Sequence, residues 1–353
     1  MPAIDTYLLD VMQRRGSDLH FIAGDPPRIR QHGDLQPLKN ERLEPAFVKD
    51  TLYEIMPKPA VERFESKDGA DFAYTLSDRG RFRVNVMRQL NGMGAVFRAI
   101  PSKALTMDEL KLPEAVRQMC RATHGLILVT GKTGSGKSTT LAAMIDDINS
   151  RVKGHILTIE DPIEFVHQRK SCLISQREIG VHSPSFAAAL HSALREDPDV
   201  ILVGELRDLE TMSIAVTAAE MGILVMGTLH TNGAAATVDR MINVFPSDKQ
   251  SHVRTMLSTS LRGVVSQQLL QRFDKQGRVA ALEILVNTPA AQNLIRQGKL
   301  DQLENVMQAG GAHGMRTMDT AIQQLLDSRQ ITGKEAYKKG INKVRFEAVK
   351  DQG

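Results

Sequence analysis

The run Gly131–Ser138 places glycine, lysine and serine at the spacing G-x-x-x-x-G-K-S. Glycines at this spacing let backbone N–H groups converge on phosphate oxygens. The lysine of such a loop reaches the β- and γ-phosphates of a nucleotide, and the hydroxyl that follows it ligates Mg²⁺. The sequence therefore predicts an ATP site with Ser138 as a ligand of Mg²⁺. Its predicted contacts are Gly131, Thr133, Gly134, Ser135, Gly136, Lys137, Ser138 and Thr139.

Hydrolysis also requires a carboxylate near the γ-phosphate that orients or deprotonates water. Acidic residues follow two apolar runs. Glu205 follows residues 200–203 and one glycine, and the cluster Glu160, Asp161 and Glu164 follows residues 156–159. An acid in such a place can also cap a helix or stay solvated in a loop. Two acidic clusters behind buried strands, beside a phosphate-binding loop, favour a catalytic role.

A histidine ends a third apolar run. His230 follows residues 224–229 and is flanked by two threonines. A lone histidine is most often a structural hydrogen-bonding group. Its place at the same predicted edge of the sheet makes a sensor of the γ-phosphate the functional alternative.

Several arginines lie on the last two predicted strands of the N-terminal region, namely Arg81, Arg83, Arg88 and Arg98. Such a run usually forms a solvated face of a strand. The functional alternative is that one or two of them are arginine fingers, entering a nucleotide site from another domain or subunit.

The phosphate-binding loop stands between a predicted strand at 126–129 and a helix whose apolar residues recur at helical spacing over 141–148. Further strands are predicted at 156–159, 200–203 and 224–229, and helices near 185–195 and 210–221. This alternation is typical of a sheet covered on both faces. The remainder is predicted to be mostly helical. A capping box at Ser247–Gln250 opens a helix with apolar spacing through Val264, and another helix covers 315–327.

The fold class is therefore α/β with two domains. Residues 1–100 are predicted to form a small α+β domain, in which Phe82, Val84 and Val86 share one strand face and residues 95–100 form another strand. The polar stretch 101–113, with a proline at each end, is the predicted linker. Residues 114–353 form the second domain.

Composition excludes several classes of protein. Two cysteines, Cys120 and Cys172, are too few for a zinc knuckle or a disulfide framework, and both are expected to be buried. No signal segment and no apolar run of about 20 residues occurs, so we expect a cytoplasmic protein. The net charge of +4 comes from interspersed charges of both signs, and tryptophan is absent. Nucleic acid is therefore disfavoured as the main ligand.

These motifs resemble those of the secretion ATPases that power type IV pili and type II secretion, and above all those of the pilus retraction ATPases. The resemblance covers nearly the whole chain, and its marks are Gly16–His20, Gly131–Ser138, Glu160–Glu164, Asp197–Asp208 and Gly227–Thr231. It implies a PAS-like first domain and a RecA-like second domain with a helical C-terminal region. It also implies a homohexamer that binds ATP between domains. Hydrolysis of Mg-ATP would retract a pilus and drive twitching motility through a platform protein, at the cytoplasmic face of the inner membrane.

The same resemblance implies roles for individual residues. Glu205 corresponds to the catalytic glutamate, Glu164 to the acidic-box carboxylate and a second candidate ligand of Mg²⁺, and His230 to the second histidine of the His box. The arginines from 81 to 98 are the candidates for the arginine finger, and the predicted catalytic residues among them are Arg81, Arg83 and Arg98. The zinc motif and extra N-terminal domain of pilus assembly ATPases have no counterpart, which favours retraction. Residues 290–299 resemble a C-terminal segment of the retraction ATPases.

The sequence departs from the family pattern at two positions. Ile223 follows Gly222 where the family has a histidine, and Lys132 replaces the usual proline. An aliphatic side chain cannot donate a hydrogen bond or change its charge. Two alternatives therefore stay open: a nucleotide-gated accessory or regulatory ring with weak hydrolysis, and a translocase of DNA or a secreted substrate.

Overall fold

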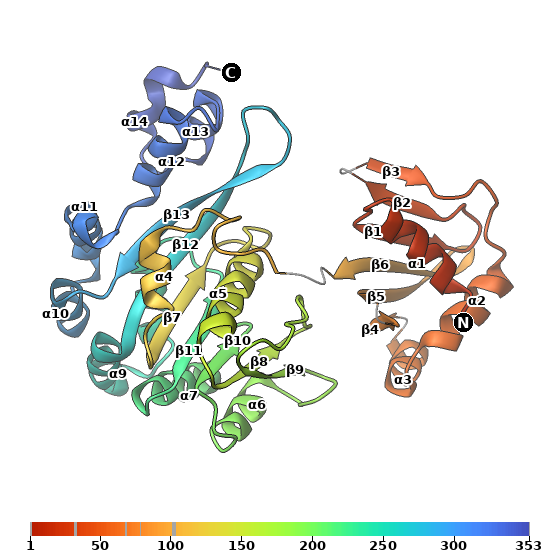
Figure 1. The fold of residues 1–353 in the computed structure, drawn as a ribbon, viewed down its shortest axis with the longest axis horizontal. Coiled ribbons are helices and arrows are strands. Elements are labelled where there is room, and N and C mark those ends of the chain that lie inside the picture. The colour runs from red at the N-terminus through yellow and green to blue at the C-terminus, as the bar shows by residue number, and fades with distance from the viewer. Residues whose placement is uncertain (1, 32–33, 68, 78, 101–103, 353) are drawn as a thin grey trace. The chain divides into compact units, whose positions relative to one another are not determined.

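The chain forms two compact units in the computed structural model (Figure 1), which describes residues 2–31, 34–67, 69–77, 79–100 and 104–352. The first unit is Met1–Lys103 with Glu164–Val166, and the second is Ala104–Ile163 with His167–Gly353. The predicted linker falls partly outside the described residues, at 101–103. Its residues 104–113 belong to the second unit, because the side chains of Met107 and Leu112 are buried there.

The first unit is built on a six-stranded sheet of order β3-β2-β1-β6-β5-β4, and every neighbouring pair is antiparallel. On β5, Phe82, Val84 and Val86 are buried at every second position, as predicted. Its elements are α1 (Ile4–Gln13), β1 (Asp18–Ile22), β2 (Arg28–Gln31), β3 (Asp34–Pro37), α2 (Pro45–Ile55), α3 (Lys58–Lys67), β4 (Gly69–Leu76), β5 (Gly80–Gln89) and β6 (Gly92–Ile100).

The second unit is built on a seven-stranded sheet of order β13-β12-β7-β11-β10-β8-β9. Its elements are α4 (Glu114–Met119), β7 (Gly125–Thr130), α5 (Lys137–Arg151), β8 (His155–Glu160), β9 (Leu173–Glu178), α6 (Phe186–Ala193), β10 (Val200–Val203), α7 (Leu209–Glu220), β11 (Leu224–Leu229), α8 (Ala234–Asn243), α9 (Ser247–Ser260), β12 (Leu261–Gln271), β13 (Arg278–Val286), α10 (Pro289–Gln297), α11 (Leu303–Ala309), α12 (Met318–Asp327), α13 (Gly333–Lys339) and α14 (Lys343–Phe346), with 3₁₀ turns at Leu300–Gln302, Gly310–His313 and Glu347–Val349.

Helices cover both faces of this second sheet. The apolar side chains of α4 and α5 pack on one face, and those of α6 to α10 pack on the other. All six residues of β7 and all four of β10 are buried, as expected for strands covered on both sides. A smaller core joins α12, α13 and α14 to the β12–β13 hairpin through Leu270 and Ala281 (Figure 1). The predicted α/β class is confirmed.

The predicted helix from 247 to 264 is wrong over its last four residues, 261–264. Helix α9 ends at Ser260, and Leu261 begins β12, which pairs with β7 and with β13. Strand β12 is buried along most of its length, so it shows no alternation of apolar and polar residues to distinguish it from a helix. The predicted capping box is also absent, because Pro246 takes the N-cap position and no side chain caps that end.

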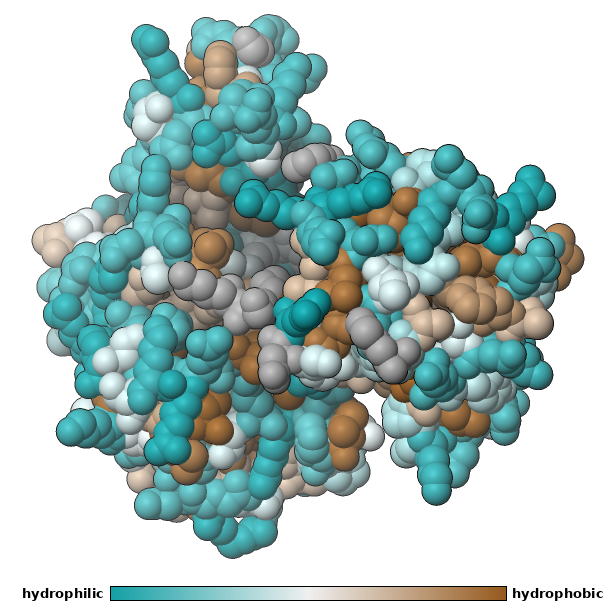
Figure 2. All heavy atoms as spheres, turned by 45° about the vertical axis from the view of Figure 1, so that its right-hand side comes forward, coloured by the Kyte–Doolittle hydropathy of each residue, from teal (hydrophilic) through white to brown (hydrophobic). Residues whose placement is uncertain are grey.

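Hydrophilic side chains cover most of the face drawn in Figure 2, with apolar residues scattered among them. Large exposed apolar residues such as Leu90, Met221 and Val344 are far apart in the chain. Among the described residues, no helix combines the length and the apolar character needed to cross a bilayer. Both cysteines are buried, as predicted.

Candidate functional site

The topology of the second sheet brings the predicted site residues to one edge. Strands β7, β11, β10 and β8 are parallel neighbours in that order. Parallel strands end at the same edge of a sheet, and ligands bind at that edge in this kind of fold. The phosphate-binding loop follows β7, His230 follows β11, Glu205 follows β10 and Glu160 ends β8. His230 therefore lies between the loop and Glu205.

Backbone conformation requires glycine in the loop at Gly131 and Gly136. Their φ angles are +140° and +90°, in the left-handed region that side chains disfavour. Both also pack closely against β12. A Cβ on Gly131 would lie 2.3 Å from the carbonyl oxygen of Gln267, and one on Gly136 would lie 2.7 Å from the Nε2 of the same residue. The loop is thus pressed against β12 at two points.

Gln267 of β12 fixes the loop through its side-chain amide. Its Nε2 donates to the carbonyl oxygen of Ser135 at 2.7 Å, and its Oε1 accepts from the hydroxyl of Thr140 at 2.7 Å. The side chain is only 3% exposed. Sequence reasoning missed this residue because it assigned the beginning of β12 to a helix. The available signal was a polar residue inside an apolar run, since a buried polar group needs a partner.

We expect Gln267→Leu to raise the KM for ATP and lower the melting temperature. The substitution removes both hydrogen bonds from buried partners, and each group left unpaired costs about 1–3 kcal/mol. Steady-state kinetics and a thermal melt measure the two effects. Gln268→Leu is the matched control, because Gln268 is the next residue of the strand, points to the other face and is partly exposed. Equal effects of the two substitutions would contradict a specific role for Gln267.

Lys137 is the first residue of helix α5, and its side chain folds back onto the loop. It is 8% exposed, and its Nζ donates to the carbonyl oxygens of Gly131 at 2.8 Å and Lys132 at 3.3 Å. The Nδ1 of His230 is 3.5 Å from the same nitrogen. The cation is therefore held at the point where the loop would hold phosphates.

The loop fits an anionic ligand on three counts. Helix α5 starts directly after Gly136, so no side chain caps its first N–H groups, and such a helix end binds anions. The hydroxyl of Ser135 is buried and has no hydrogen-bond partner among the described residues. Lys137 supplies the positive charge. The described residues contain no cluster of three acidic, histidine or cysteine side chains that could hold a metal ion.

Glu205 is held in place by its backbone neighbours and by two side chains. The N–H of Gly204 donates to the carbonyl of Ile159 at 2.7 Å, and that of Leu206 donates to the carbonyl of Thr228 at 2.9 Å. The carboxylate of Glu205 lies 2.6 Å from the guanidinium of Arg207 and 3.2 Å from the Nε2 of His230. Lys137, His230 and Glu205 thus form one continuous chain of polar contacts.

The charge of Glu205 is set by these neighbours. Burial alone would raise the pKa of its carboxyl group, but the hydrogen bonds and charges of Arg207 and His230 outweigh burial and lower that pKa below its usual range. Glu205 is therefore ionised at neutral pH. A carboxylate of low pKa is a weak base and a good acceptor, so it is suited to orienting water.

We expect Arg207→Gln to move the acidic limb of the pH–rate profile to higher pH. A carboxylate with a lowered pKa keeps its charge until the pH falls through that pKa, and activity is lost there. Without the guanidinium the pKa rises, so the loss begins at a higher pH. The profile of kcat/KM for ATP between about pH 4 and pH 8 measures this shift. Arg207→Lys keeps the positive charge, so its acidic limb should lie at a lower pH than that of Arg207→Gln. An identical limb in the wild type and Arg207→Gln would contradict the role of Arg207.

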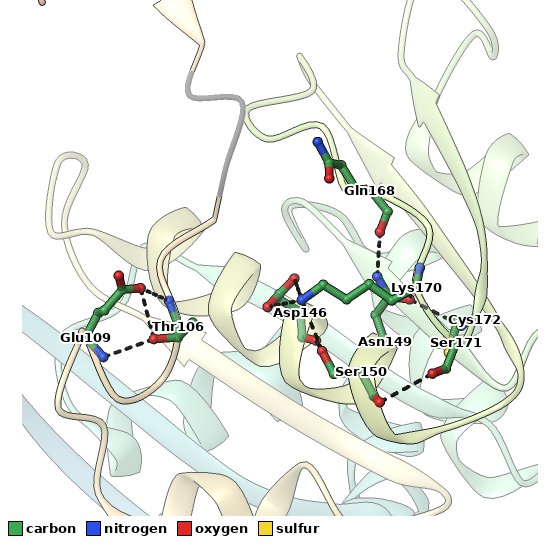
Figure 3. Close-up of polar contacts among 9 residues, drawn as sticks. All are labelled: Thr106, Glu109, Asp146, Asn149, Ser150, Gln168, Lys170, Ser171 and Cys172. Atoms are coloured by element: carbon green, nitrogen blue, oxygen red, sulfur yellow. Dashed lines mark hydrogen bonds and ion pairs between the residues drawn. The ribbon is translucent and has the colours of Figure 1, made fainter.

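Helix α5 also anchors residues 168–172, the segment that follows Glu160–Glu164 in the chain (Figure 3). Asn149 is fully buried, its Nδ2 donates to the carbonyl of Gln168 at 2.7 Å, and its Oδ1 accepts from the N–H groups of Lys170 and Cys172 at 3.2 Å each. The ammonium of Lys170 pairs with Asp146 of the same helix at 2.7 Å. The helix that opens at the phosphate-binding loop therefore fixes the path of the chain into β9.

Other predicted site residues are not brought into this group within the second unit. Glu160 ends β8 and accepts hydrogen bonds from Thr158 at 2.7 Å and Gln176 at 3.2 Å. Glu164 is exposed and belongs to the short segment 164–166 that is grouped with the first unit. Its role and its ligation of Mg²⁺ stay predictions.

The finger candidates lie on the last two strands of the first unit. Arg81 and Arg83 are on β5 and Arg98 is on β6. Arg98 forms an ion pair of 2.8 Å with Asp18, whose side chain is 6% exposed, and Arg83 lies 3.8 Å from Asp71. Asp18 belongs to the motif at residues 16–20, so Arg98 has a structural partner inside its own unit.

Ile223 lies at the opposite edge of the sheet from the phosphate-binding loop. It precedes β11, whereas His230 follows that strand, and roughly 20 Å of extended chain separates the two positions. The side chain of Ile223 packs against the apolar core of the second unit. The departure from the His-box pattern therefore leaves the contacts of His230 with Lys137 and Glu205 intact.

Comparison with known proteins agrees with this geometry. The chain is 50% identical over 335 residues to the type IV pilus retraction ATPase PilT of Pseudomonas aeruginosa, which covers 95% of this chain and 97% of that protein. It is 50% identical over 334 residues to a twitching motility protein of Neisseria gonorrhoeae, covering 93% and 89%. A crystal structure of the pilus retraction motor PilT with bound ADP superposes with a TM-score of 0.91 at 42% identity, covering 98% of this chain and 99% of that one. The type II/IV secretion system proteins match residues 1–346, and the chain belongs to this family.

Proposed function

We propose that this chain is a motor ATPase that hydrolyses Mg-ATP to retract type IV pili. The observation that carries the proposal is the continuous line of polar contacts from Lys137 through His230 to Glu205, beside a loop built for phosphates. The names of the two relatives, a pilus retraction ATPase and a twitching motility protein, supply the mechanical task.

The finer assignments belong to the same proposal. The first unit is PAS-like, the second is RecA-like, and six chains form a ring. The ring acts on an inner-membrane platform protein at the cytoplasmic face, and associates with the membrane only through that partner. Arg81, Arg83 or Arg98 supplies the arginine finger, and Glu164 assists at the metal. These assignments rest on the motifs of the sequence and on the family.

The chemistry is transfer of the γ-phosphoryl group to water. Lys137 and the N–H groups of the loop offset the charge that spreads over the phosphate oxygens. The hydroxyl of Ser138 would hold the Mg²⁺ of the nucleotide, which would offset further charge on the phosphates. The carboxylate of Glu205 orients the attacking water, and His230 joins that carboxylate to the lysine.

The base and ribose of the nucleotide have a place beside the loop. A pocket of about 700 Å³ opens there, and its lining includes Gly136, Thr139, Thr140, Leu269 and Arg278. Thr139, one of the predicted contacts of the nucleotide, lines this pocket together with Gly136. The volume of this pocket suits a nucleoside better than a bare phosphate.

Two measurements test the proposal. The purified chain should release phosphate from Mg-ATP, and chelation of the metal should stop the reaction. Cells that lack the chain should accumulate surface pili and lose twitching, and only a hydrolysing chain should restore movement. Hydrolysis without any effect on pili would contradict the role in pilus retraction and would leave the ATPase activity in place.

The accessory-ring alternative rests on Ile223 and makes a different prediction. An accessory ring binds ATP tightly with little turnover, and Ile223→His raises that turnover. Because Ile223 lies away from the lysine and glutamate, we expect this substitution to leave the wild-type rate nearly unchanged. The translocase alternative predicts that DNA stimulates hydrolysis and that salt abolishes the stimulation.

A further inference from the structure

Glu283 is a buried carboxylate that holds the first residues of two helices. It lies on β13 and is 5% exposed. Its Oε1 accepts from the N–H of Ala234, the first residue of α8, at 2.6 Å, and its Oε2 accepts from the N–H of Met318, the first residue of α12, at 3.1 Å. One side chain thus joins helices that are far apart in the sequence.

Helix α8 has no cap of its own. Its N-cap residue is Gly233, with φ of +94°, and no side chain of the helix satisfies its first N–H groups. The partners come from the neighbouring strands instead. Ser266 of β12 accepts from the N–H of Gly233 at 2.9 Å, and Ser266 pairs directly across the sheet with Glu283. Helix α12 differs, because Thr317 caps it.

The turn that these two side chains hold carries His230. Only residues 231–233 separate that histidine from Ala234, and its ring lies 3.2 Å from the carboxylate of Glu205 and 3.5 Å from the ammonium of Lys137. A shift of the start of α8 would therefore change the two contacts that join the lysine to the glutamate.

The surroundings of Glu283 disfavour a negative charge on its carboxyl group. No ion pair among the described residues includes it, and Glu304 and Asp319 add negative charge nearby. Burial is the main reason that its pKa is raised, and the two N–H donors only partly offset burial. An apolar residue would avoid this cost, so the carboxylate stands at a position where its two acceptors matter.

We propose that Glu283 is a positioning residue, which sets the orientation of His230 by fixing the start of α8 and ties that orientation to helix α12. This inference rests on the proposed ATPase function. Glu283 does not touch the reacting groups, so its effect passes through His230. The phosphate-binding loop is held separately by Gln267, and binding of ATP is expected to be largely independent of Glu283.

The test is Glu283→Gln in two backgrounds. In the wild-type background we expect kcat to fall about 10-fold with KM for ATP changed less than about 2-fold, because small misplacement of a reacting group is costly. In the His230→Ala background the same substitution should lower kcat less than about 2-fold, since its target is gone. An equal loss in both backgrounds, or no loss in the first, would overturn the proposal.

Two further variants separate positioning from general damage to the fold. Ser266→Ala removes only the bond to Gly233, and should lower kcat in the wild-type background and not with His230→Ala. If Glu283→Gln does not fold, the comparison of Ser266→Ala in the two backgrounds tests the proposal in its place. Thr317→Ala removes the separate cap of α12 and should leave kcat unchanged. A loss with Thr317→Ala as large as with Glu283→Gln would assign the effect to helix stability. Wild-type hydrolysis is measured first, and its absence would refute the proposed function rather than the role of Glu283.

Discussion

Replacing Glu205 with glutamine is expected to lower steady-state phosphate release by about 10²–10⁴-fold, the usual contribution of a positioned carboxylate. The amide has nearly the same shape, so its neighbours stay in place. It carries no negative charge, so it no longer attracts the proton of the attacking water or pairs fully with Arg207 and His230. The KM for ATP should change little, because the loop, Lys137 and Gln267 are untouched.

Phosphate release and binding of a fluorescent nucleotide, measured side by side, check this result. The matched control is Glu210→Gln, an exposed glutamate in the first turn of α7. That variant should hydrolyse ATP at the wild-type rate. A Glu205→Gln protein that turns over as fast as the wild type would remove Glu205 from the mechanism.

Alanine at Lys137 is expected to reduce hydrolysis by at least about 10²-fold and to weaken ATP binding as well. The side chain is buried, and its ammonium holds two loop carbonyls together besides facing the phosphates. Its loss removes the attraction for phosphate and a support of the loop. Both kcat and KM should therefore worsen, in contrast to the effect of Glu205→Gln.

Lys153→Ala is the control for the lysine. Lys153 is exposed just beyond the other end of helix α5, so the substitution removes a charge of the same sign far from the loop. We expect its kinetics to match the wild type within about 2-fold, as for most surface changes. Nucleotide binding by Lys137→Ala at wild-type affinity would contradict the assigned site.

Short patterns in the sequence were sufficient to predict which residues lie at the phosphate-binding edge of the sheet. The shared position of the loop motif, Glu205 and His230 was predictable, because each follows an apolar run that ends at one edge of the sheet. The order of the strands, which places His230 between the other two, was not predictable. It depends on β11 pairing between β7 and β10, which no local pattern specifies.

The groups that hold the site were missed for a physical reason. Gln267, Ser266 and Glu283 are polar residues buried on β12 and β13. Binary patterning treats polar residues as exposed, and a strand covered on both faces has no period of two to correct that assumption. Only their partners, the loop and the helix ends, explain why they are buried.

The hydrogen bond from Gln267 to the phosphate-binding loop has a consequence for biosynthesis. Gln267 and Ser135 are 132 positions apart in the chain. At about 5–20 residues per second, a ribosome needs roughly 7–26 s to make the intervening chain. During that interval the nascent polypeptide contains the whole phosphate-binding motif but lacks the strand against which the motif is pressed. The ability to hold a nucleotide should therefore appear late in translation, only after β12 has emerged and paired with β7.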